Sequence, residues 1–137
     1  MSNASRVLIV DDNPEIVRAA SIRLRAAGFD PISAADGCEG IASAVKNHPD
    51  AIVLDVRMPV MDGLTALAEL RSRSETRNIP IVMLSASIVD QQAALEAGAR
   101  FFLKKPYEGN NLVNAVTTAM RNGVEVPTTP PAKSGDA

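Results

Sequence analysis

Residues 51–55 have the sequence Ala-Ile-Val-Leu-Asp, in which four apolar residues in a row are directly followed by an aspartate. Residues 81–85, Ile-Val-Met-Leu-Ser, repeat this pattern with a serine at the end. A short apolar run without polar alternation is typical of a strand that is buried on both faces. These two segments therefore predict the central strands of a parallel sheet covered by helices.

Outward from these runs, further strands alternate with segments that carry the signals of helices. Asn13-Pro14 is a typical helix start, Gly28 is a typical helix stop, and Asp62-Gly63 starts another helix. Strands are predicted at residues 6–10, 29–34, 51–54, 81–84 and 100–103, and helices at about 14–27, 36–47, from 63, from just after Ser85 to 97, and 108–120. The alternation predicts an α/β fold with a doubly wound, mostly parallel five-stranded sheet. Pro31 favours an edge position for the second strand.

Composition excludes several classes of function. The chain has 137 residues, which is the length of one ordinary domain, and 14 basic residues against 16 acidic ones, with no basic run. We therefore expect no direct nucleic-acid binding. The apolar stretch at residues 79–89 is too short and too interrupted to span a membrane. A single cysteine, Cys38, rules out an internal disulfide and favours a reducing, cytoplasmic compartment, and we expect it to be a small buried hydrophobe.

The C-terminal segment differs from the rest of the chain. Residues 124–137 contain three of the nine prolines and few residues that could anchor them to a core. We therefore expect a domain at residues 5–122, followed by a disordered tail or a truncated linker at 123–137.

Polar side chains follow four of the five predicted strands, namely Asp11 and Asp12, Asp55, Ser85 and Lys105. In an open parallel sheet, ligands bind at the carboxyl ends of the strands where the strand order reverses. With the order 2-1-3-4-5, the three aspartates would converge there. Three close carboxylates hold either a proton or a cation, and Mg²⁺ is the divalent ion that best fits oxygen ligands and phosphate. The pattern thus predicts an aspartate that attacks a phosphoryl group, assisted by an ammonium and a hydroxyl.

Each of these residues also has an ordinary structural interpretation. Taken singly, an aspartate before a helix is most often a cap, a serine after a strand is most often a helix cap, and a lysine is most often a solvated charge. Their coincidence at successive strand ends favours a common site.

Several short motifs together resemble the receiver domains of bacterial response regulators. The resemblance covers roughly residues 5–122 and rests on Val10-Asp11-Asp12-Asn13, Asp55-Val56-Arg57-Met58-Pro59, Met61-Asp62-Gly63, Ser85-Ala86, Ala97-Gly98-Ala99 and Lys105-Pro106. It implies the flavodoxin-like (βα)5 receiver fold with strand order 2-1-3-4-5.

The resemblance also implies roles for individual residues. Asp55 would be the phosphoacceptor, supplied by a histidine kinase or a histidine phosphotransfer protein. Mg²⁺ would be held by Asp12 directly, by Asp11 through water, by Asp55 and by the backbone carbonyl of Arg57. The phosphoryl oxygens would contact Ser85 and Lys105, and the Lys105–Pro106 bond would be cis.

For signalling, the resemblance implies that Ser85 and Phe102 change position together. Phosphorylation would then alter the face formed by the fourth helix, the fifth strand and the fifth helix. That face would control a downstream protein or a fused effector, and dimerisation through it stays an open alternative. Phe102 lacks the hydroxyl of the commoner tyrosine, so its part in the switch would be packing.

Two other functions remain as alternatives. The first is a receiver that acts as a protein-interaction module without phosphorylation, against which the intact set of site residues argues. The second is a Mg²⁺-dependent phosphatase, but such enzymes usually carry an acid/base aspartate two residues after the nucleophile, where this chain has Arg57. We therefore expect a signalling phosphoacceptor, not an enzyme.

Overall fold

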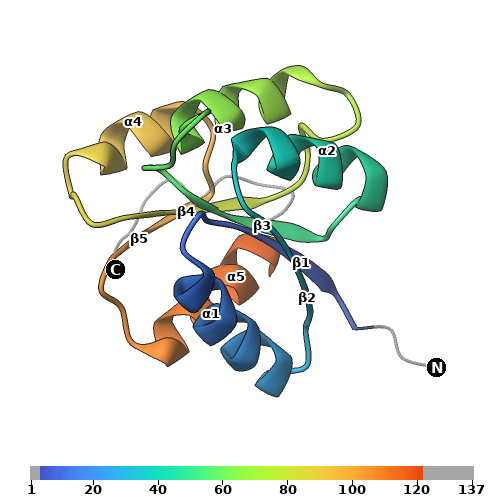
Figure 1. Cartoon of the computed structure of the whole chain (residues 1–137), viewed down its shortest axis with the longest axis vertical. Coiled ribbons are helices and arrows are strands. Elements are labelled where there is room, and N and C mark those ends of the chain that lie inside the picture. The colour runs from blue at the N-terminus through green and yellow to red at the C-terminus, as the bar shows by residue number, and fades with distance from the viewer. Residues whose placement is uncertain (1–3, 122–137) are drawn as a thin grey trace.

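The computed structural model describes residues 4–121, and its centre is a parallel sheet with helices on both faces (Figure 1). The strand order is β2-β1-β3-β4-β5, as predicted, which leaves Pro31 on an edge strand. The strands are β1 (Arg6–Val10), β2 (Asp30–Ala34), β3 (Ala51–Asp55), β4 (Ile81–Ser85) and β5 (Phe101–Lys104). The helices are α1 (Pro14–Ala26), α2 (Gly37–Asn47), α3 (Gly63–Ser72), α4 (Asp90–Glu96) and α5 (Gly109–Arg121). The tail or linker predicted at 123–137 lies outside the described residues.

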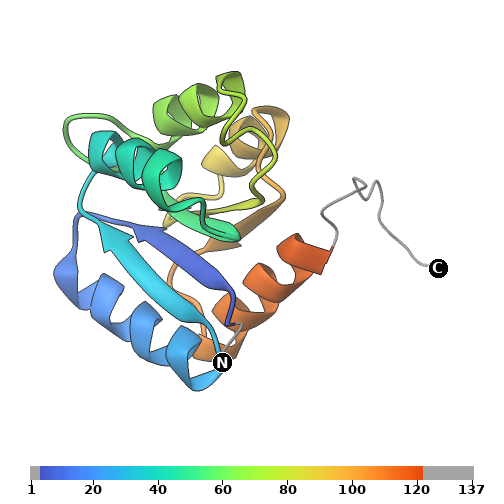
Figure 2. The same cartoon turned by 90° about the vertical axis from the view of Figure 1, so that its right-hand side faces the viewer.

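The sheet divides the core into two layers because successive side chains of a strand point to opposite faces. In β1, Val7 and Ile9 pack with α1 and α5, whereas Leu8 and Val10 pack with α2 and α3. Figure 2 shows α1 and α5 together on one side of the sheet and the other helices on the opposite side. Every residue of β3 and β4 is buried, so both central strands are enclosed by apolar side chains as their sequences predicted.

Helix starts and stops follow the local signals in the sequence. The side chain of Asn13 accepts a hydrogen bond from the Glu15 N–H at 2.9 Å, and Pro14 begins α1. Asp62 caps α3 in the same way through the Thr65 N–H at 2.8 Å. Gly28 has a φ of 97°, a conformation that suits glycine after a helix.

Helix α4 is shorter than predicted, because it begins at Asp90 and not directly after Ser85. The intervening residues form a turn held by side-chain hydrogen bonds. The Ser87 N–H donates to the Ser85 hydroxyl, and the Val89 N–H donates to the Ser87 hydroxyl. Serine side chains that satisfy nearby backbone groups compete with the helical hydrogen-bond pattern. These two serines therefore delay the start of α4.

The strand boundaries differ slightly from the prediction. Asp55 and Ser85 are the last residues of β3 and β4, not the first residues of the loops. The reason is that the ladder continues past them, because the Val56 N–H donates to the Leu84 carbonyl and the Lys105 N–H donates to the Ser85 carbonyl. Both side chains are thus attached to rigid backbone.

The expectation of a buried Cys38 was wrong, because its thiol-bearing side chain is exposed. The buried face of α2 is formed by Gly37, Gly40, Ile41 and Ala44, and position 38 lies off this stripe. No helix within residues 4–121 combines the length and the apolar character needed to cross a bilayer.

Candidate functional site

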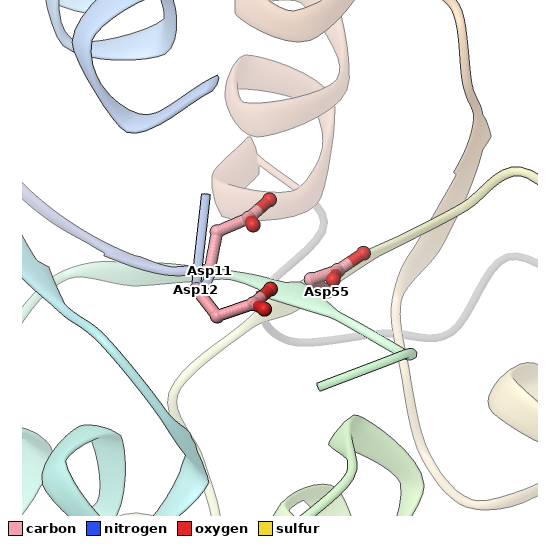
Figure 3. Close-up of side chains that lie close together, drawn as sticks. All are labelled: Asp11, Asp12 and Asp55. Atoms are coloured by element: carbon pink, nitrogen blue, oxygen red, sulfur yellow. The ribbon is translucent and has the colours of Figure 1, made fainter. Parts of the chain in front are cut away.

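Three aspartates meet at the carboxyl ends of β1 and β3. Asp11 and Asp12 directly follow β1, Asp55 ends β3, and one carboxylate oxygen from each lies within 4.8 Å of the others. Figure 3 shows their side chains gathered at this edge of the sheet. Asp11 and Asp55 are buried and Asp12 is exposed. We call this group the acidic pocket.

The backbone around β1 fixes the position of Asp11. Its N–H donates to the Ala34 carbonyl at 3.2 Å, which extends the pairing with β2 by one residue. Its Oδ1 accepts a hydrogen bond from the Asn13 N–H at 2.9 Å. Its other oxygen, Oδ2, is left to face the pocket.

Lys105, which follows β5, places a positive charge in the acidic pocket. Its Nζ donates to Asp55 Oδ1 at 2.9 Å and to Asp11 Oδ2 at 3.3 Å. Burial alone would lower the pKa of Lys105, but the hydrogen bond and the charge of Asp55, together with Asp11, raise it above its ordinary value. The peptide bond between Lys105 and Pro106 is cis, as the resemblance implied.

The acidic pocket carries more negative than positive charge. Burial raises the pKa of Asp55, and the nearby charges of Asp11 and Asp12 also raise it, against the lowering effect of Lys105. A site with three carboxylates and one ammonium is therefore suited to a further cation. Its donors are all oxygens, which fits a hard divalent ion such as Mg²⁺. Asp11, Asp12 and Asp55 are the side chains that could hold it.

The loop after β3 packs closely against the backbone of Asp55, the candidate phosphoacceptor. The Gly63 N–H donates to the Val56 carbonyl at 2.7 Å, and a Cβ at position 63 would overlap the Asp55 carbonyl oxygen. Only glycine fits such a close approach to the backbone. Arg57 lies in this loop, two residues after Asp55, and its side chain points toward α4, where it pairs with Asp90.

Ser85 ends β4 and is almost completely buried. Its Oγ donates to Asp90 Oδ2 at 2.6 Å and accepts from the Ser87 N–H at 3.0 Å. A surface pocket of about 300 Å³ is lined by Arg57, Ser85, Ala86 and Ser87. The structure thus brings Ser85 to the same edge of the sheet as Asp55 and Lys105, with its hydroxyl bonded to Asp90.

Phe102 lies on β5, where its half-buried ring packs against the core layer on the α2, α3 and α4 side. Its predicted movement with Ser85 stays a prediction. Lys104, the residue before Lys105, is exposed at the end of β5.

Asp90 makes contacts with two residues of the site, Arg57 and Ser85, that the sequence did not reveal. It is buried, it accepts the Ser85 hydroxyl, and it accepts two hydrogen bonds from the Arg57 guanidinium at 3.1 and 3.2 Å. These bonds, first from Ser85 and then from Arg57, hold the pKa of Asp90 below its ordinary value. With α4 predicted to begin directly after Ser85, position 90 fell inside a helix, and its contact with Ser85 could not be inferred. The signal in the sequence that could have indicated a later start of α4 was the presence of two serines, Ser85 and Ser87, which favour a turn.

Comparison with known proteins identifies relatives across most of the chain. Residues 7–117 match the family model described as the response regulator receiver domain. The transcriptional regulatory protein PrrA of Mycobacterium tuberculosis is 42% identical over 118 residues, which is 85% of this chain and 50% of that protein. The DNA-binding dual master transcriptional regulator RpaA of Synechocystis is 38% identical over 124 residues, 89% of this chain and 52% of that protein. The chain therefore spans about half the length of these relatives.

Solved structures give the same result. The chemotaxis protein CheY4 of Vibrio cholerae superposes with a TM-score of 0.79 at 35% identity, covering 85% of this chain and 98% of that one. The receiver domain of the sensor histidine kinase PA1611 of Pseudomonas aeruginosa has a TM-score of 0.80 at 32% identity, covering 86% and 98%. That structure is described as having a magnesium ion coordinated in its active site cleft.

Proposed function

The chain belongs to the response regulator receiver domain family, and on this premise we propose that Asp55 accepts a phosphoryl group in a Mg²⁺-dependent reaction. The observation that carries the proposal is the surroundings of Asp55. Its carboxylate is buried, bonded to Lys105 at 2.9 Å, and within 4.8 Å of the carboxylates of Asp11 and Asp12.

The chemistry follows from these contacts. A carboxylate oxygen of Asp55 attacks phosphorus and forms an acyl phosphate, while the bond from phosphorus to the donor breaks and the donor leaves with the electron pair. Asp11, Asp12, Asp55 and the carbonyl of Arg57 would hold Mg²⁺, which when bound neutralises charge on the phosphoryl oxygens. Lys105 would stabilise the same oxygens through its ammonium, and Ser85 would donate a hydrogen bond to one of them.

A phosphodonor needs access to Asp55. Next to Lys105, a pocket of about 510 Å³ opens between the start of α1 and the segment after β5, and its lining includes Asn13, Ile16, Lys105 and Tyr107. Asp55 itself does not line this pocket, so the donor that we propose, a histidine kinase or a histidine phosphotransfer protein, rests on the family to which the chain belongs.

The loop after Asp55 supports a signalling role over a phosphatase. The residue two positions after Asp55 is Arg57, whose guanidinium is engaged with Asp90 and offers no acid/base group to a leaving alcohol. We therefore propose that the phosphoryl group is held as a signal and not turned over on small substrates.

The output of the signal is proposed from the relatives. PrrA and RpaA are transcriptional regulators, and each is about twice as long as the segment that matches this chain. We propose that residues 5–122 act as the receiver unit, with Ser85 and Phe102 as the switch, and that the face formed by α4, β5 and α5 controls a partner protein or an attached effector. Direct contact with nucleic acid would belong to such an effector, and a homodimer through the same face remains the alternative assembly.

The test is intact-mass spectrometry after incubation with acetyl phosphate and Mg²⁺. Wild type should gain about 80 Da, the mass of one phosphoryl group, and Asp55→Asn should gain nothing. Asp30→Asn, which changes an exposed aspartate at the start of the edge strand, is the matched control and should be labelled like wild type. Equal labelling of Asp55→Asn would contradict the proposal. A wild type that neither gains mass nor binds Mg²⁺ would favour the module that works without phosphorylation.

A further inference from the structure

The Ser85 hydroxyl is already engaged in the structure described here. It is 1% exposed, and its proton is directed to Asp90 Oδ2 at 2.6 Å. The backbone N–H of Ser87 donates to the same hydroxyl at 3.0 Å, which leaves the proton as the part of the group that can be redirected. Ser85 is therefore held by one acceptor in the first turn of α4 and by one donor in the turn that precedes this helix.

Asp90 is itself held in place by Arg57. The guanidinium donates through Nε to Oδ2 at 3.2 Å and through a terminal nitrogen to Oδ1 at 3.1 Å, so the pair is bidentate. The side chain of Asp90 is 11% exposed, whereas that of Arg57 is 68% exposed. We call these three residues, Arg57, Ser85 and Asp90, the Asp90 network.

A hydroxyl carries one proton, whereas an acyl phosphate offers only acceptors. Ser85 cannot donate to Asp90 and to a phosphoryl group on Asp55 at the same time. We propose that Asp90 is a positioning residue that, with Arg57, holds the Ser85 hydroxyl in the unphosphorylated arrangement and so opposes phosphoryl binding. This inference rests on the proposed function, because it concerns the same phosphoryl group.

Release of the Ser85 hydroxyl from Asp90 would leave few groups of the Asp90 network without a hydrogen-bond partner. When the Ser85 proton turns to the phosphoryl group, Asp90 keeps both bonds from Arg57 and stays paired. The cost of release is then one hydrogen bond to a charged acceptor. Phosphoryl affinity is lowered by the fraction of molecules in which Ser85 is held back.

A purely structural role for Asp90 has to be weighed beside this one. Asp90 is in the first turn of α4, where a carboxylate stabilises the helix through its dipole, and the capping residue Val89 makes no side-chain cap bond. A dipole role needs only the charge at the helix start. It does not need a 2.6 Å bond to a serine five positions earlier in the chain, on the strand that ends beside Asp55. The two roles predict different effects of Asp90 on ligand binding.

The test measures binding of the phosphoryl analogue BeF₃⁻, in the presence of Mg²⁺, by NMR of the ¹⁵N-labelled full chain. Asp90→Ala should bind the analogue about tenfold more tightly than wild type, from the size of a hydrogen bond to a charged group. Asp90→Asn, which keeps the shape of the side chain, should shift the affinity in the same direction by less. Glu96→Ala, an exposed acidic residue on the same helix, should bind like wild type.

Two further readouts separate positioning from a structural role. In the analogue-free protein, Asp90→Ala should move the amide resonance of Ser87 toward its position in analogue-bound wild type, because that amide donates to the Ser85 hydroxyl. In a double-mutant cycle, Asp90→Ala should tighten binding in wild type but not in the Ser85→Ala background. A structural role of Asp90 would act equally in both backgrounds.

The outcomes are distinct. If wild type binds BeF₃⁻, and Asp90→Ala and Asp90→Asn bind it no more tightly, the positioning role is overturned while the phosphoacceptor role stands. The positioning role is also overturned if Asp90→Ala tightens binding of BeF₃⁻ equally in wild type and in the Ser85→Ala background. If wild type fails to bind the analogue, or Asp55→Asn binds it as well as wild type, the proposed function itself fails and the inference falls with it.

Discussion

At the carboxyl edge of the sheet, the acidic pocket and the Asp90 network lie next to each other, and they differ in how well their charges are balanced. In the acidic pocket, Lys105 pairs with Asp11 and Asp55 while Asp12 adds a third carboxylate, and the pKa of Asp55 is raised, chiefly by burial. In the Asp90 network, one carboxylate meets one guanidinium and one hydroxyl, and the pKa of Asp90 is lowered by those bonds. The first group has an excess of negative charge that a cation would offset, whereas the charges of the second group are balanced within the group.

The largest effect should come from removing the cation of the acidic pocket. We expect Lys105→Met to lower the free energy of unfolding by about 3 kcal/mol at neutral pH without divalent ions, because Asp11 and Asp55 would be left buried without the cation that pairs with them. Mg²⁺ should restore part of the loss, since it supplies positive charge to the same oxygens. Urea denaturation with and without Mg²⁺ measures both effects.

Lys104→Met is the matched control, because this neighbouring lysine is exposed and its ammonium donates a hydrogen bond to the Lys105 carbonyl at 3.2 Å. Its effect should stay within about 0.5 kcal/mol, as for most surface substitutions. Equal losses for the two lysine variants would contradict the account of the acidic pocket.

Breaking the Asp90 network should lower the free energy of unfolding by a smaller amount, and this loss should not depend on Mg²⁺. We expect Asp90→Ala to lower the free energy of unfolding by about 1 kcal/mol at pH 7, since Arg57 is largely exposed and water replaces part of its pairing. The pKa of Asp90 is lower in the folded protein than its unfolded value of 3.8, so its contribution is present above that value. It should be lost as the pH falls through the lowered pKa.

Urea denaturation at a series of pH values, with Glu96→Ala as the control, measures this contribution. Restoration of Asp90→Ala stability by Mg²⁺ would mean that the Asp90 network and the acidic pocket are not separate in the way described here.

Substitution of Asp55 should raise the free energy of unfolding, by an amount similar to or smaller than the loss expected for Asp90→Ala. In Mg²⁺-free buffer at pH 7, Asp55→Asn should raise the free energy of unfolding by up to about 1 kcal/mol, because it removes a charge that is close to two like charges. The pKa of Asp55 is raised in the folded protein, so its carboxyl group favours the folded state below its unfolded value of 3.8. That advantage is lost as the pH rises through the raised pKa.

The gain from Asp55→Asn should therefore disappear at acidic pH, and it should shrink when Mg²⁺ stabilises wild type. Denaturation at pH 3.5 and pH 7, with and without Mg²⁺, tests both statements, and Glu108→Gln, an exposed acid near α5, serves as the control. A destabilised Asp55→Asn under Mg²⁺-free conditions would show that the bond to Lys105 outweighs the repulsion.

Local patterns predicted the acidic pocket well and the Asp90 network poorly, for a physical reason. Asp11, Asp12, Asp55 and Lys105 follow strands whose apolar runs are unambiguous, and parallel pairing brings the ends of such strands together. The strand order and the edge position of Pro31 followed from the same patterns and the family resemblance.

The Asp90 network depends on side-chain geometry between segments. Arg57 and Asp90 are 33 positions apart, and their pairing requires the turn at Ser85 and Ser87 that delays α4. Cys38 illustrates the same limit, since a general tendency of cysteine to be buried was overridden by its place on the outer side of α2. The periodicity of a sequence does not predict side-chain contacts that depend on the residue at which a turn begins.

The enclosure of β3 and β4 by apolar side chains on both faces has a consequence for how such a domain diversifies. Asp55 and Ser85 end strands in which every residue is buried, so the packing of the core fixes the positions of these two side chains. The outer faces of the helices contribute little to that placement. A lineage of duplicated genes could therefore exchange outer-face residues, such as Ile88, Val89 and Leu95 beside or on α4, and acquire separate signalling partners while the reactive edge stays unchanged.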